Sequence, residues 1–547
     1  MNVPSRWNLR DLQLGARQQL GAGQRRWIVY TLVLGLGLSS GALAGELTTL
    51  TLPGPGGNGG MYLPDLQASY PGVDWQALDR LYIPAAHYRF INLGNLPQRS
   101  PDHPLVITNQ GGQVRVGGLD FYYNFSINGG SNWILTGRYD AAAQTGHVDF
   151  PGHAAGYRHS QGRYGILIND ELQDDNSGLG IGGGATDFEI EFLEVTRVGF
   201  AGFNFKSNDN GDDHMSRVRI HDNYIHDVGS EGMYLGSTQA APQHKLPQLE
   251  VYNNRVIRTG TEIGQFGHLA DGSRIHHNVF VFGALDWKNP FQNFQDNGIQ
   301  YDHREGSVEF DHNLVIGGAD KFMIFFGKDW AGDVHLPTDV SHIHHNYFSH
   351  SRNYGAYIHQ SGDGVTTYRI TDNSFREINF HYDELNPGAT DFNQVFRIFN
   401  SINPIELTNN LWDGPQSFFA ASGGNVVASG NQPATIPPVV FVDSGFPADF
   451  DYLLLEIWTD VDSHGEPVLY EVGDYVSYDS VLYRCLEQHS GRIPPDRPDT
   501  WQPLSTPPDD YRLRPDSPFQ GYGLLDNLVE TDLFADGFEG GDTSAWQ

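Results

Sequence analysis

The sequence contains a single cysteine, Cys485, in 547 residues. No disulfide can form within the chain, so stability must come from packing and backbone pairing. Basic residues are also scarce, because 33 Lys and Arg stand against 66 Asp and Glu, which gives 33 − 66 = −33. Nucleic-acid binding needs a basic face, and this charge excludes it as the general function.

Long apolar runs are scarce as well, and the one near the start of the chain covers only residues 27–38. A basic segment ending at Arg26 precedes this run, and a small-residue cleavage pattern ending at Ala44 follows it, as in a signal peptide. The run is well short of the ~20 apolar residues of a membrane span. We therefore expect residues 1–44 to be a signal peptide, and the mature chain to be a secreted, extracellular bacterial protein without a membrane segment. Its net charge would be 28 − 65 = −37.

Glycine is abundant, at 65 residues, and aromatic residues make up 12% of the chain. The apolar fraction of 39% is ordinary, which argues against a disordered chain. A turn-rich, aromatic-rich and acidic composition indicates a long all-β protein. The length exceeds what one compact globular core accommodates.

A short pattern recurs along the chain: an aliphatic residue or Phe, two mostly polar residues, Asn, any residue and usually another aliphatic residue or Phe. The shared asparagines are Asn223, Asn254, Asn278, Asn313, Asn346, Asn373 and Asn410. Their steps of 31, 24, 35, 33, 27 and 37 residues indicate a solenoid with loops of unequal length. Strand-like alternation within the unit excludes a helical repeat. We expect these asparagines to stack in one internal line, with their amides bonded along it.

A second strand-like segment occurs before the first asparagine and after several others, starting at Gly202, Gly232, Gly298, Phe322 and Gly355. Strands repeated once per turn describe a parallel β-helix, whose coils pair at ~4.8 Å. The span 54–410 resembles the right-handed parallel β-helix (pectate-lyase-like) superfamily, and we expect about ten coils. Lyases, glycosidases, epimerases and non-catalytic adhesins share this fold, so the resemblance implies the fold and leaves the activity open.

The end of the chain is composite. Residues 456–504 carry a Gly-Asp-x-Val-x-Tyr core at 473–478 and a terminal tryptophan, and they resemble the chitin-binding type-3 module. The alternative is an ordinary loop, although structureless loops of this length are rare. Sugar binding by such a module needs aromatic faces, and the candidates are Trp458, Tyr470, Tyr478 and Trp501. The expected organisation is a β-helix at 45–455, the inserted module at 456–504, the closing segment of the β-helix at 505–532 and an acidic flexible tail at 533–547.

Alternation along the strands separates core from surface. The aligned segments predict an inward column of Phe205, Leu235, Tyr301, Phe325 and Ile358. They predict an outward column of Asn204, Tyr234, Gln300, Ile324 and Tyr357. Polar residues directly after the strands would lie side by side on neighbouring coils and line a groove for a linear polymer. These residues are Lys206, Asp302, His303, Arg304, Lys328 and His359.

The first hypothesis for this groove is a polysaccharide lyase. β-Elimination needs a base at the C5 proton of a uronate and a cation beside its carboxylate. Arg304 or Lys206 would neutralise the carboxylate, and His303 or Tyr234 would exchange the protons. Asp302 would orient the histidine. Residues 302–305 also faintly resemble the Asp-Pro-His-Asp motif of mannuronan epimerases, without its proline and final aspartate.

The second hypothesis is a glycoside hydrolase, which needs two carboxylates beside the scissile bond. Glu231, Glu262, Asp302 and Glu305 are the candidates. The third is a non-catalytic polysaccharide-binding surface protein. The net charge repels a polyuronate, whereas the resemblance to the lyase superfamily favours acidic polymers, so the sequence leaves these hypotheses open. In each case the expected partner is a polysaccharide and the protein is a monomer.

No cofactor is predicted with certainty, but two patterns suit a metal ion. Residues 208–213 (NDNGDD) form an oxygen-rich loop, either a Ca²⁺ site or a plain Asx-rich turn. His277, His312 and His345 each precede a ladder asparagine. Stacked coils would bring their imidazoles together, either as metal ligands or as a stack beside the asparagines. The pattern itself offers no supporting carboxylate.

Overall fold

The computed structural model describes most of residues 47–525. The segments left out within that range are 119–121, 138–163, 174–175, 207–214, 237–243, 287–294, 318–319, 326–332, 360–361, 380–392, 416, 424, 447–449, 451–454, 463–464, 480 and 505–508. The predicted signal peptide, the acidic tail, Lys328 and the oxygen-rich loop at 208–213 therefore lie outside the described residues. No helix in the described part of the chain has the length and apolarity to cross a membrane.

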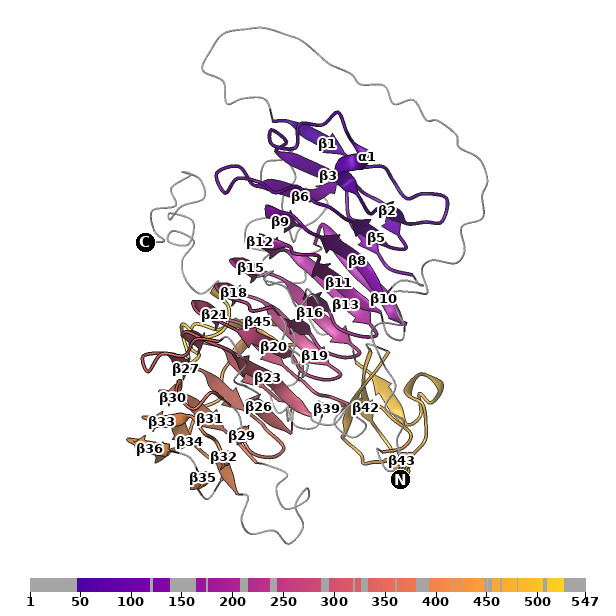
Figure 1. The fold of residues 1–547 in the computed structure, drawn as a ribbon. Coiled ribbons are helices and arrows are strands. Elements are labelled where there is room, and N and C mark those ends of the chain that lie inside the picture. The colour runs from indigo at the N-terminus through magenta and orange to yellow at the C-terminus, as the bar shows by residue number, and fades with distance from the viewer. Residues whose placement is uncertain are drawn as a thin grey trace, which may run out of the picture. The chain divides into compact units, whose positions relative to one another are not determined.

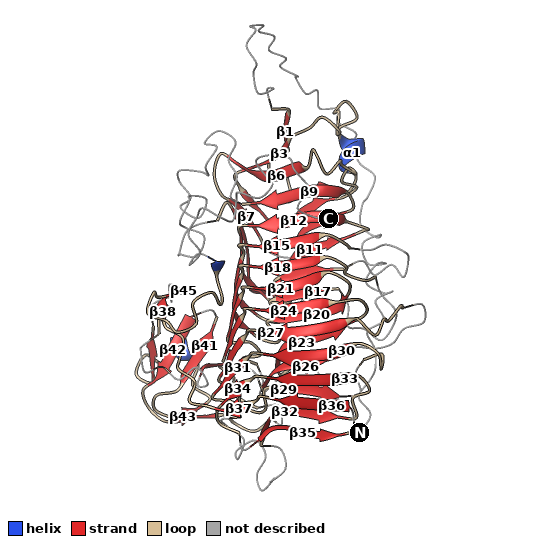
Figure 2. Cartoon of the chain, turned by 90° about the vertical axis from the view of Figure 1, so that its left-hand side faces the viewer, coloured by secondary structure: helices blue, strands red, loops and turns tan. Residues whose placement is uncertain are grey.

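Three long parallel sheets form the structure, and each coil of the chain contributes one strand to each of them in turn (Figures 1 and 2). We call them sheets A, B and C. Sheet A has 13 strands, and sheets B and C have 12 each. This confirms the predicted right-handed parallel β-helix, with slightly more coils than the ten expected.

The bounds of the strands follow from the pairing. Sheet A contains β1 (Thr49–Thr51), β3 (Arg80–Pro84), β6 (Leu105–Gln110), β9 (Ser131–Thr136), β12 (Thr186–Glu191), β15 (Val218–His221), β18 (Leu249–Tyr252), β21 (Ser273–His276), β24 (Val308–Asp311), β27 (Val340–His344), β30 (Thr367–Thr371), β33 (Pro404–Thr408) and β36 (Asn425–Ser429). Sheet B contains β2 (Met61–Leu63), β5 (Ile91–Leu93), β8 (Tyr123–Asn128), β11 (Ser177–Gly182), β14 (Phe203–Phe205), β17 (Met233–Leu235), β20 (Gly264–Leu269), β23 (Asn297–His303), β26 (Lys321–Phe325), β29 (Ala356–His359), β32 (Gln394–Phe399) and β35 (Ser417–Ser422).

Sheet C contains β4 (His87–Tyr88), β7 (Val114–Val116), β10 (Ile166–Gln173), β13 (Leu193–Val198), β16 (Tyr224–Val228), β19 (Arg255–Thr259), β22 (Val279–Val281), β25 (Leu314–Ile316), β28 (Tyr347–Ser349), β31 (Ser374–Arg376), β34 (Leu411–Trp412) and β37 (Gln432–Pro433). The one short α-helix is α1 (Leu66–Ser69), among the described residues. The elements after the coils are β38 (Phe441–Asp443), β39 (Leu455–Ile457), β40 (Leu469–Tyr470), β41 (Tyr475–Tyr478), β42 (Val481–Cys485), β43 (His489–Ser490), the 3-10 helix η3 (Pro494–Asp496), β44 (Trp501–Pro503) and β45 (Asp510–Leu513).

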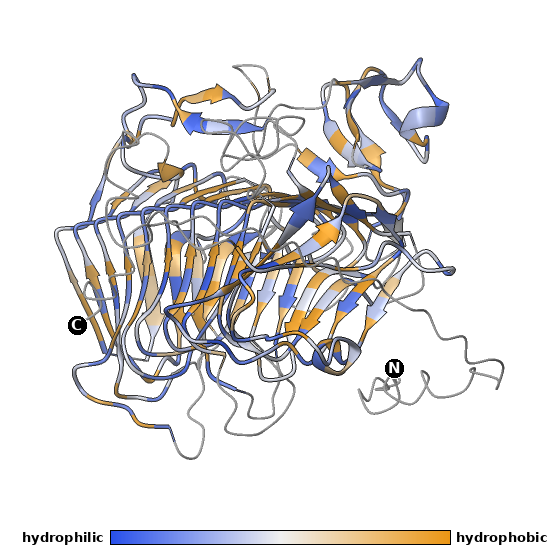
Figure 3. Ribbon diagram, turned by 90° about the horizontal axis from the view of Figure 1, so that it is seen from above, coloured by the Kyte–Doolittle hydropathy of each residue, from blue (hydrophilic) through white to orange (hydrophobic). Residues whose placement is uncertain are grey.

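The core lies inside the coils, because alternate residues of every strand point inward. Apolar and polar residues accordingly alternate along the strands in Figure 3. Along sheet B the inward column pairs in register and is at most 2% exposed, as predicted. Its members are Phe205, Leu235, Phe266, Tyr301, Phe325 and Ile358.

The asparagine ladder sits at the turn between sheets A and C, and the seven predicted asparagines occupy it. Each Nδ2 donates to the Oδ1 of the next asparagine at 2.8–3.1 Å, and the ladder continues to Asn431. The residue before each of the seven has a φ of 51–57°. Asp, Asn and His tolerate this left-handed conformation better than most residues, which explains why they occupy those positions.

The outward face of sheet C is apolar on β19, β22 and β25, and the end of the chain covers it there. Ile257, Val279 and Leu314 of sheet C pack in one buried cluster with Tyr475 and Tyr511, which come from β41 and β45. β45 returns to pair antiparallel with β38. The residues that flank the predicted insertion therefore lie side by side.

A buried ionic cluster ties this returning segment to sheet C. The Asp509 carboxylate accepts hydrogen bonds from Arg258 at 2.7 and 2.8 Å and from the Tyr224 hydroxyl at 2.5 Å. Arg255 donates to the Asp509 carbonyl at 2.7 Å. Both Arg258 and Asp509 are at most 3% exposed, and Asp227 pairs with the other edge of Arg258.

Candidate active site

A column of buried polar side chains runs across the outward face of sheet B. Asn204, Tyr234, Gln265 and Gln300 are register partners on β14, β17, β20 and β23. The register agrees with the predicted outward column, and it adds Gln265 on a coil that the sequence pattern passed over. All four side chains are at most 6% exposed, so the open groove expected here is not seen at these strands.

Lys206 and Tyr234 meet at this face, as the sequence predicted. Lys206 follows β14, and its Nζ lies 4.1 Å from the centre of the Tyr234 ring on the next coil. A cation over an aromatic face is attracted by the ring quadrupole. This contact fixes the ammonium group beside the polar column.

Two glutamates lie just before the first residues of β17 and β20. Glu231 and Glu262 occupy equivalent positions one coil apart, because the amide of Gly202 donates to the Glu231 carbonyl and the amide of Gly232 donates to the Glu262 carbonyl. Glu231 is 1% exposed and Glu262 is fully buried. We call these two residues the carboxyl pair.

Amide side chains hold the carboxyl pair. Gln295 donates to Oε1 of Glu231 at 3.2 Å, and Gln300 donates to Oε1 of Glu262. The Oε2 atoms of both glutamates have no hydrogen-bond partner among the described residues.

Burial decides the protonation of the carboxyl pair. It raises the pKa of Glu231, against the attraction of Lys206. Burial and then the charge of Glu231 raise the pKa of Glu262 well above its usual value. Two neighbouring carboxylates in a low-dielectric site do not both ionise readily, so these surroundings favour the form of the pair that holds one proton.

The predicted Asp302–His303–Arg304 sequence divides into two parts, because Asp302 and Arg304 both lie near His268, whereas His303 contacts the Gly306 carbonyl. Asp302 lies on the outward face, with Oδ2 3.5 Å from Nε2 of His268 on the preceding coil. Burial and then the charge of Arg304 lower the pKa of His268 to about 4. His303 is 3% exposed, its Nε2 contacts the Gly306 carbonyl at 3.0 Å, and burial lowers its pKa.

Arg304 is paired with an acidic residue in this structure. It forms a bidentate ion pair with Asp333, and Nη2 donates at 3.1 Å. Lys245 joins the same network, 2.5 Å from Glu305 and 3.2 Å from Asp333. Lys321 at the start of β26 is likewise paired, 2.6 Å from an oxygen of Asp320. Each of these cations is balanced by carboxylates.

The small sheet β39-β41-β42-β44 forms around its own aromatic core. Tyr470 and Trp501 are buried there, at 1% and 0% exposure. The Tyr470 hydroxyl donates to the Thr459 carbonyl, and the Trp501 indole donates to the Arg492 carbonyl. Trp458 and Tyr478 are half-buried at the edge, with ring centres 5.4 Å apart. Of the four predicted sugar-binding aromatics, only these two keep accessible ring surface.

The predicted histidine column is a stack. The rings of His277, His312 and His345 are parallel within 4°, with centres 4.8 and 5.2 Å apart. Asp311 supplies the carboxylate that the sequence pattern lacked, since its Oδ2 lies 2.7 Å from Nδ1 of His312. The stack lies at the turn between sheets A and C, beside the asparagine ladder.

No model of a known protein family matches the chain. No curated protein matches it by sequence. Among solved structures, an alginate lyase from Paenibacillus sp. str. FPU-7 is 13% identical, with 70% of this chain and 99% of that chain covered and a TM-score of 0.35. A GH136 lacto-N-biosidase from Eubacterium ramulus is 10% identical over 65% of this chain and 62% of that chain, with a TM-score of 0.41. The pectate lyase Pel9A is 10% identical over 77% and 87%, with a TM-score of 0.31. Each activity named here belongs to that protein.

Proposed function

We propose that this protein is a secreted polysaccharide-degrading enzyme that hydrolyses a glycosidic bond on the outward face of sheet B. The observation that carries the proposal is the carboxyl pair of Glu231 and Glu262, buried on adjacent coils with raised pKa values. Glycoside hydrolysis uses two carboxyl groups, one protonated and one ionised, beside the scissile bond. A coupled pair that holds one proton supplies both forms.

The surroundings suggest a role for each glutamate. Glu262 has the more strongly raised pKa and would be the general acid that protonates the leaving glycosidic oxygen. Glu231 is attracted by Lys206 and would be the ionised partner, acting as nucleophile or as base on water. Gln265 and Gln300 are amides on the same face and would hydrogen-bond sugar hydroxyl groups.

The charges near the site favour a neutral or acetamido polymer over a polyuronate. Arg304, Lys245 and Lys321 have carboxylate partners, so none of them is left to neutralise a substrate carboxylate. The chain as a whole carries −33, which repels an anionic polymer. A neutral sugar chain meets neither obstacle.

β-Elimination remains the second candidate, and the contact of Lys206 with Tyr234 supports it. An ammonium group and a phenol one coil apart are the types of residue that proton removal from a uronate requires. In that mechanism Lys206 and Tyr234 would handle the protons, and the protonated carboxyl of the pair would donate to the substrate carboxylate. His303 and Arg304 would then act only as supports.

The deciding experiment measures two products at once. The protein is incubated with neutral, acetamido and uronate polymers, and reducing ends and the absorbance of unsaturated ends are followed together. Hydrolysis produces reducing ends without unsaturated ends, whereas elimination produces both. Binding without either product would support the non-catalytic hypothesis and contradict an enzyme that cleaves the polymer.

Variants of the carboxyl pair test the assignment. Glu262→Gln and Glu231→Gln should each lower the rate on the order of 10²-fold or more, because one of the two required groups loses its proton chemistry. Glu406→Gln is the matched control, since Glu406 is 41% exposed on sheet A and pairs with Arg369. Wild-type rates in both pair variants would remove this site from consideration.

A further inference from the structure

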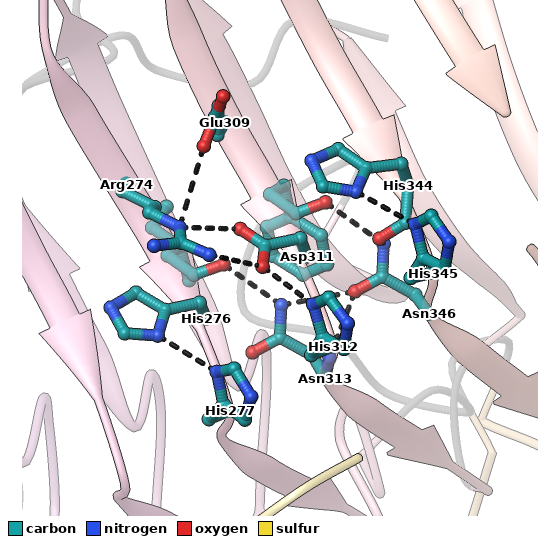
Figure 4. Close-up of polar contacts among 12 residues, drawn as sticks. Arg274, His276, His277, Glu309, Asp311, His312, Asn313, His344, His345 and Asn346 are labelled. Atoms are coloured by element: carbon teal, nitrogen blue, oxygen red, sulfur yellow. Dashed lines mark hydrogen bonds and ion pairs between the residues drawn. The ribbon is translucent and has the colours of Figure 1, made fainter. Parts of the chain in front are cut away.

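Histidines gather on three consecutive coils of sheet A, away from the carboxyl pair. His276 ends β21, His312 follows β24 and His344 ends β27 (Figure 4). His342 lies two residues before His344 on β27. Glu309 and Asp311 on β24 lie among these rings (Figure 4). The sequence pattern pointed to imidazoles here but not to the carboxylates, which come from the strand between two histidine-bearing coils.

Three of these residues offer ligand atoms at one place. Glu309 is the register partner of His342, and His344 follows on the same face two residues later. The His342 and His344 ring centres are 4.0 Å apart. One ligand atom from each of the three residues lies within 4.8 Å of the others. The Glu309 side chain is 49% exposed and both imidazoles are half-buried, so a dissolved ion can reach the group.

We propose that Glu309, His342 and His344 form a binding site for a divalent transition-metal ion of the Zn²⁺ type. Two imidazoles and one carboxylate suit Zn²⁺ and its neighbours, whereas Ca²⁺ and Mg²⁺ prefer sites made of oxygen alone. Three protein ligands leave further coordination positions for water. The ion would link β24 to β27 and so join two adjacent coils through their side chains.

A second group of possible ligands, His277, Asp311 and His312, lies next to this site but is already engaged. The Asp311 carboxylate is fully buried, accepts two hydrogen bonds from Arg274 at 2.8 and 2.7 Å, and contacts Nδ1 of His312 at 2.7 Å. A metal ion there would have to displace the guanidinium. Arg274 approaches Glu309 only at 3.4 Å, so an ion bound to Glu309 can leave the stronger Arg274–Asp311 pair intact.

Metal titration of the full-length protein tests the site. Zn²⁺ binding is measured by equilibrium dialysis and calorimetry, and Co²⁺ serves as a spectroscopic probe of the ligand set. His342→Gln, His344→Gln and Glu309→Gln should each weaken binding at least tenfold, because each removes one of three protein ligands. Loss of an outer-sphere partner alone costs 10–100-fold. Zn²⁺ should also raise the melting temperature of the wild type and not that of these variants, since an ion that binds only the folded state stabilises it.

Two controls separate this site from the other histidines. His87→Gln changes an exposed histidine on β4, and His312→Gln removes an imidazole of the neighbouring group. Both variants should bind Zn²⁺ as the wild type does. Unchanged binding in all three site variants, or loss in His312→Gln alone, would overturn the proposal. Circular dichroism confirms that each variant is folded before binding is compared.

Discussion

At the scale of single residues, the asparagine ladder makes this solenoid regular. The seven predicted ladder asparagines are buried and hydrogen-bonded to the coils on both sides, so replacing one leaves donors of its neighbours without partners. Asn313→Leu removes the Oδ1 that accepts from the amide and Nδ2 of Asn278, at 3.0 Å each. Stranding buried polar groups costs roughly 1–3 kcal/mol each, so we expect unfolding free energy to fall by about 2–4 kcal/mol in urea denaturation.

The last member of the ladder provides the control for this prediction. Asn431 is half-buried, and it accepts from Asn410 at 2.8 Å and donates to the Leu407 carbonyl at 2.7 Å. Water can replace these bonds at the end of the stack, so Asn431→Leu should cost clearly less than Asn313→Leu. Equal losses in the two variants would show that the ladder position has no special energetic role.

At the scale of elements, the returning segment is held by charge. Asp509→Asn removes the buried carboxylate that faces Arg258, and breaking a buried ion pair costs roughly 3–5 kcal/mol. Asp227 still contacts Arg258 in this variant. We therefore expect the unfolding free energy, measured by chemical denaturation, to fall by about 3 kcal/mol, at the lower end of that range. Asp516→Asn is the matched control, since Asp516 and Arg514 are both more than half exposed, and such pairs contribute 0–1 kcal/mol. A loss of unfolding free energy no larger than that of the control would contradict the stabilising role of this buried ionic cluster.

The inserted segment is the second element that can be tested separately. Deleting residues 456–504 should leave the β-helix folded, because β38 and β45 lie side by side and the inner core of the coils is a separate cluster. The melting temperature should still fall, because Tyr475 and Leu482 no longer cover sheet C. We also propose that the half-buried Trp458 and Tyr478 bind sugar, so the deletion should weaken retention on insoluble polymer and spare activity on soluble polymer.

A point variant separates the two effects of this deletion. Trp458→Ala should reduce retention on insoluble polymer without changing the melting temperature by as much as the deletion does. Loss of folding in the deletion variant would show that the segment is an integral part of the solenoid.

At the scale of the whole molecule, stability should decline at alkaline pH. Burial opposes charge on His221 and His226, but hydrogen bonds to carboxylates outweigh it. The bonds that His221 makes to Asp222 and Glu189 raise its pKa to about 10, and those that His226 makes to Asp227 and Glu194 raise its pKa to about 9. The folded state therefore binds more protons than the unfolded state between pH 6.5 and these values. The contribution of these two histidines to stability is full below pH 6.5 and is lost as pH rises through 9–10. The raised pKa of Glu262 acts in the same direction from pH 4.5 upward.

Melting curves from pH 6 to pH 10 measure this decline. The wild type should lose on the order of a few kcal/mol over that range. His221→Gln should be less stable at pH 7 but flatter with pH, whereas His87→Gln, at an exposed position on β4, should keep the wild-type slope. A His221→Gln curve as steep as that of the wild type would contradict the linkage.

The sequence by itself determined the solenoid, because the coil pattern is local. Strand alternation fixed the inward column from Phe205 to Ile358, and the ladder asparagines follow residues that tolerate a positive φ. The pattern missed β20, whose segment Gly264-Gln-Phe-Gly does not stand out from the neighbouring sequence as the other segments do. At the strands that the pattern did mark, the outward-facing residues were predictable. The number of coils was nearly so.

Only the tertiary structure decided which polar groups meet and what charge they hold. Arg304 pairs with Asp333, 29 residues later in the sequence, and Glu231 lies one coil away from Glu262. Loops of unequal length separate the members of each pair, so the sequence spacing does not reveal that they are neighbours. Burial then raises the pKa of the two glutamates and lowers that of His268, and burial is a property of the packed coils. Glu309 joins His342 for the same reason: strand register across coils, which no local pattern encodes, brings them together.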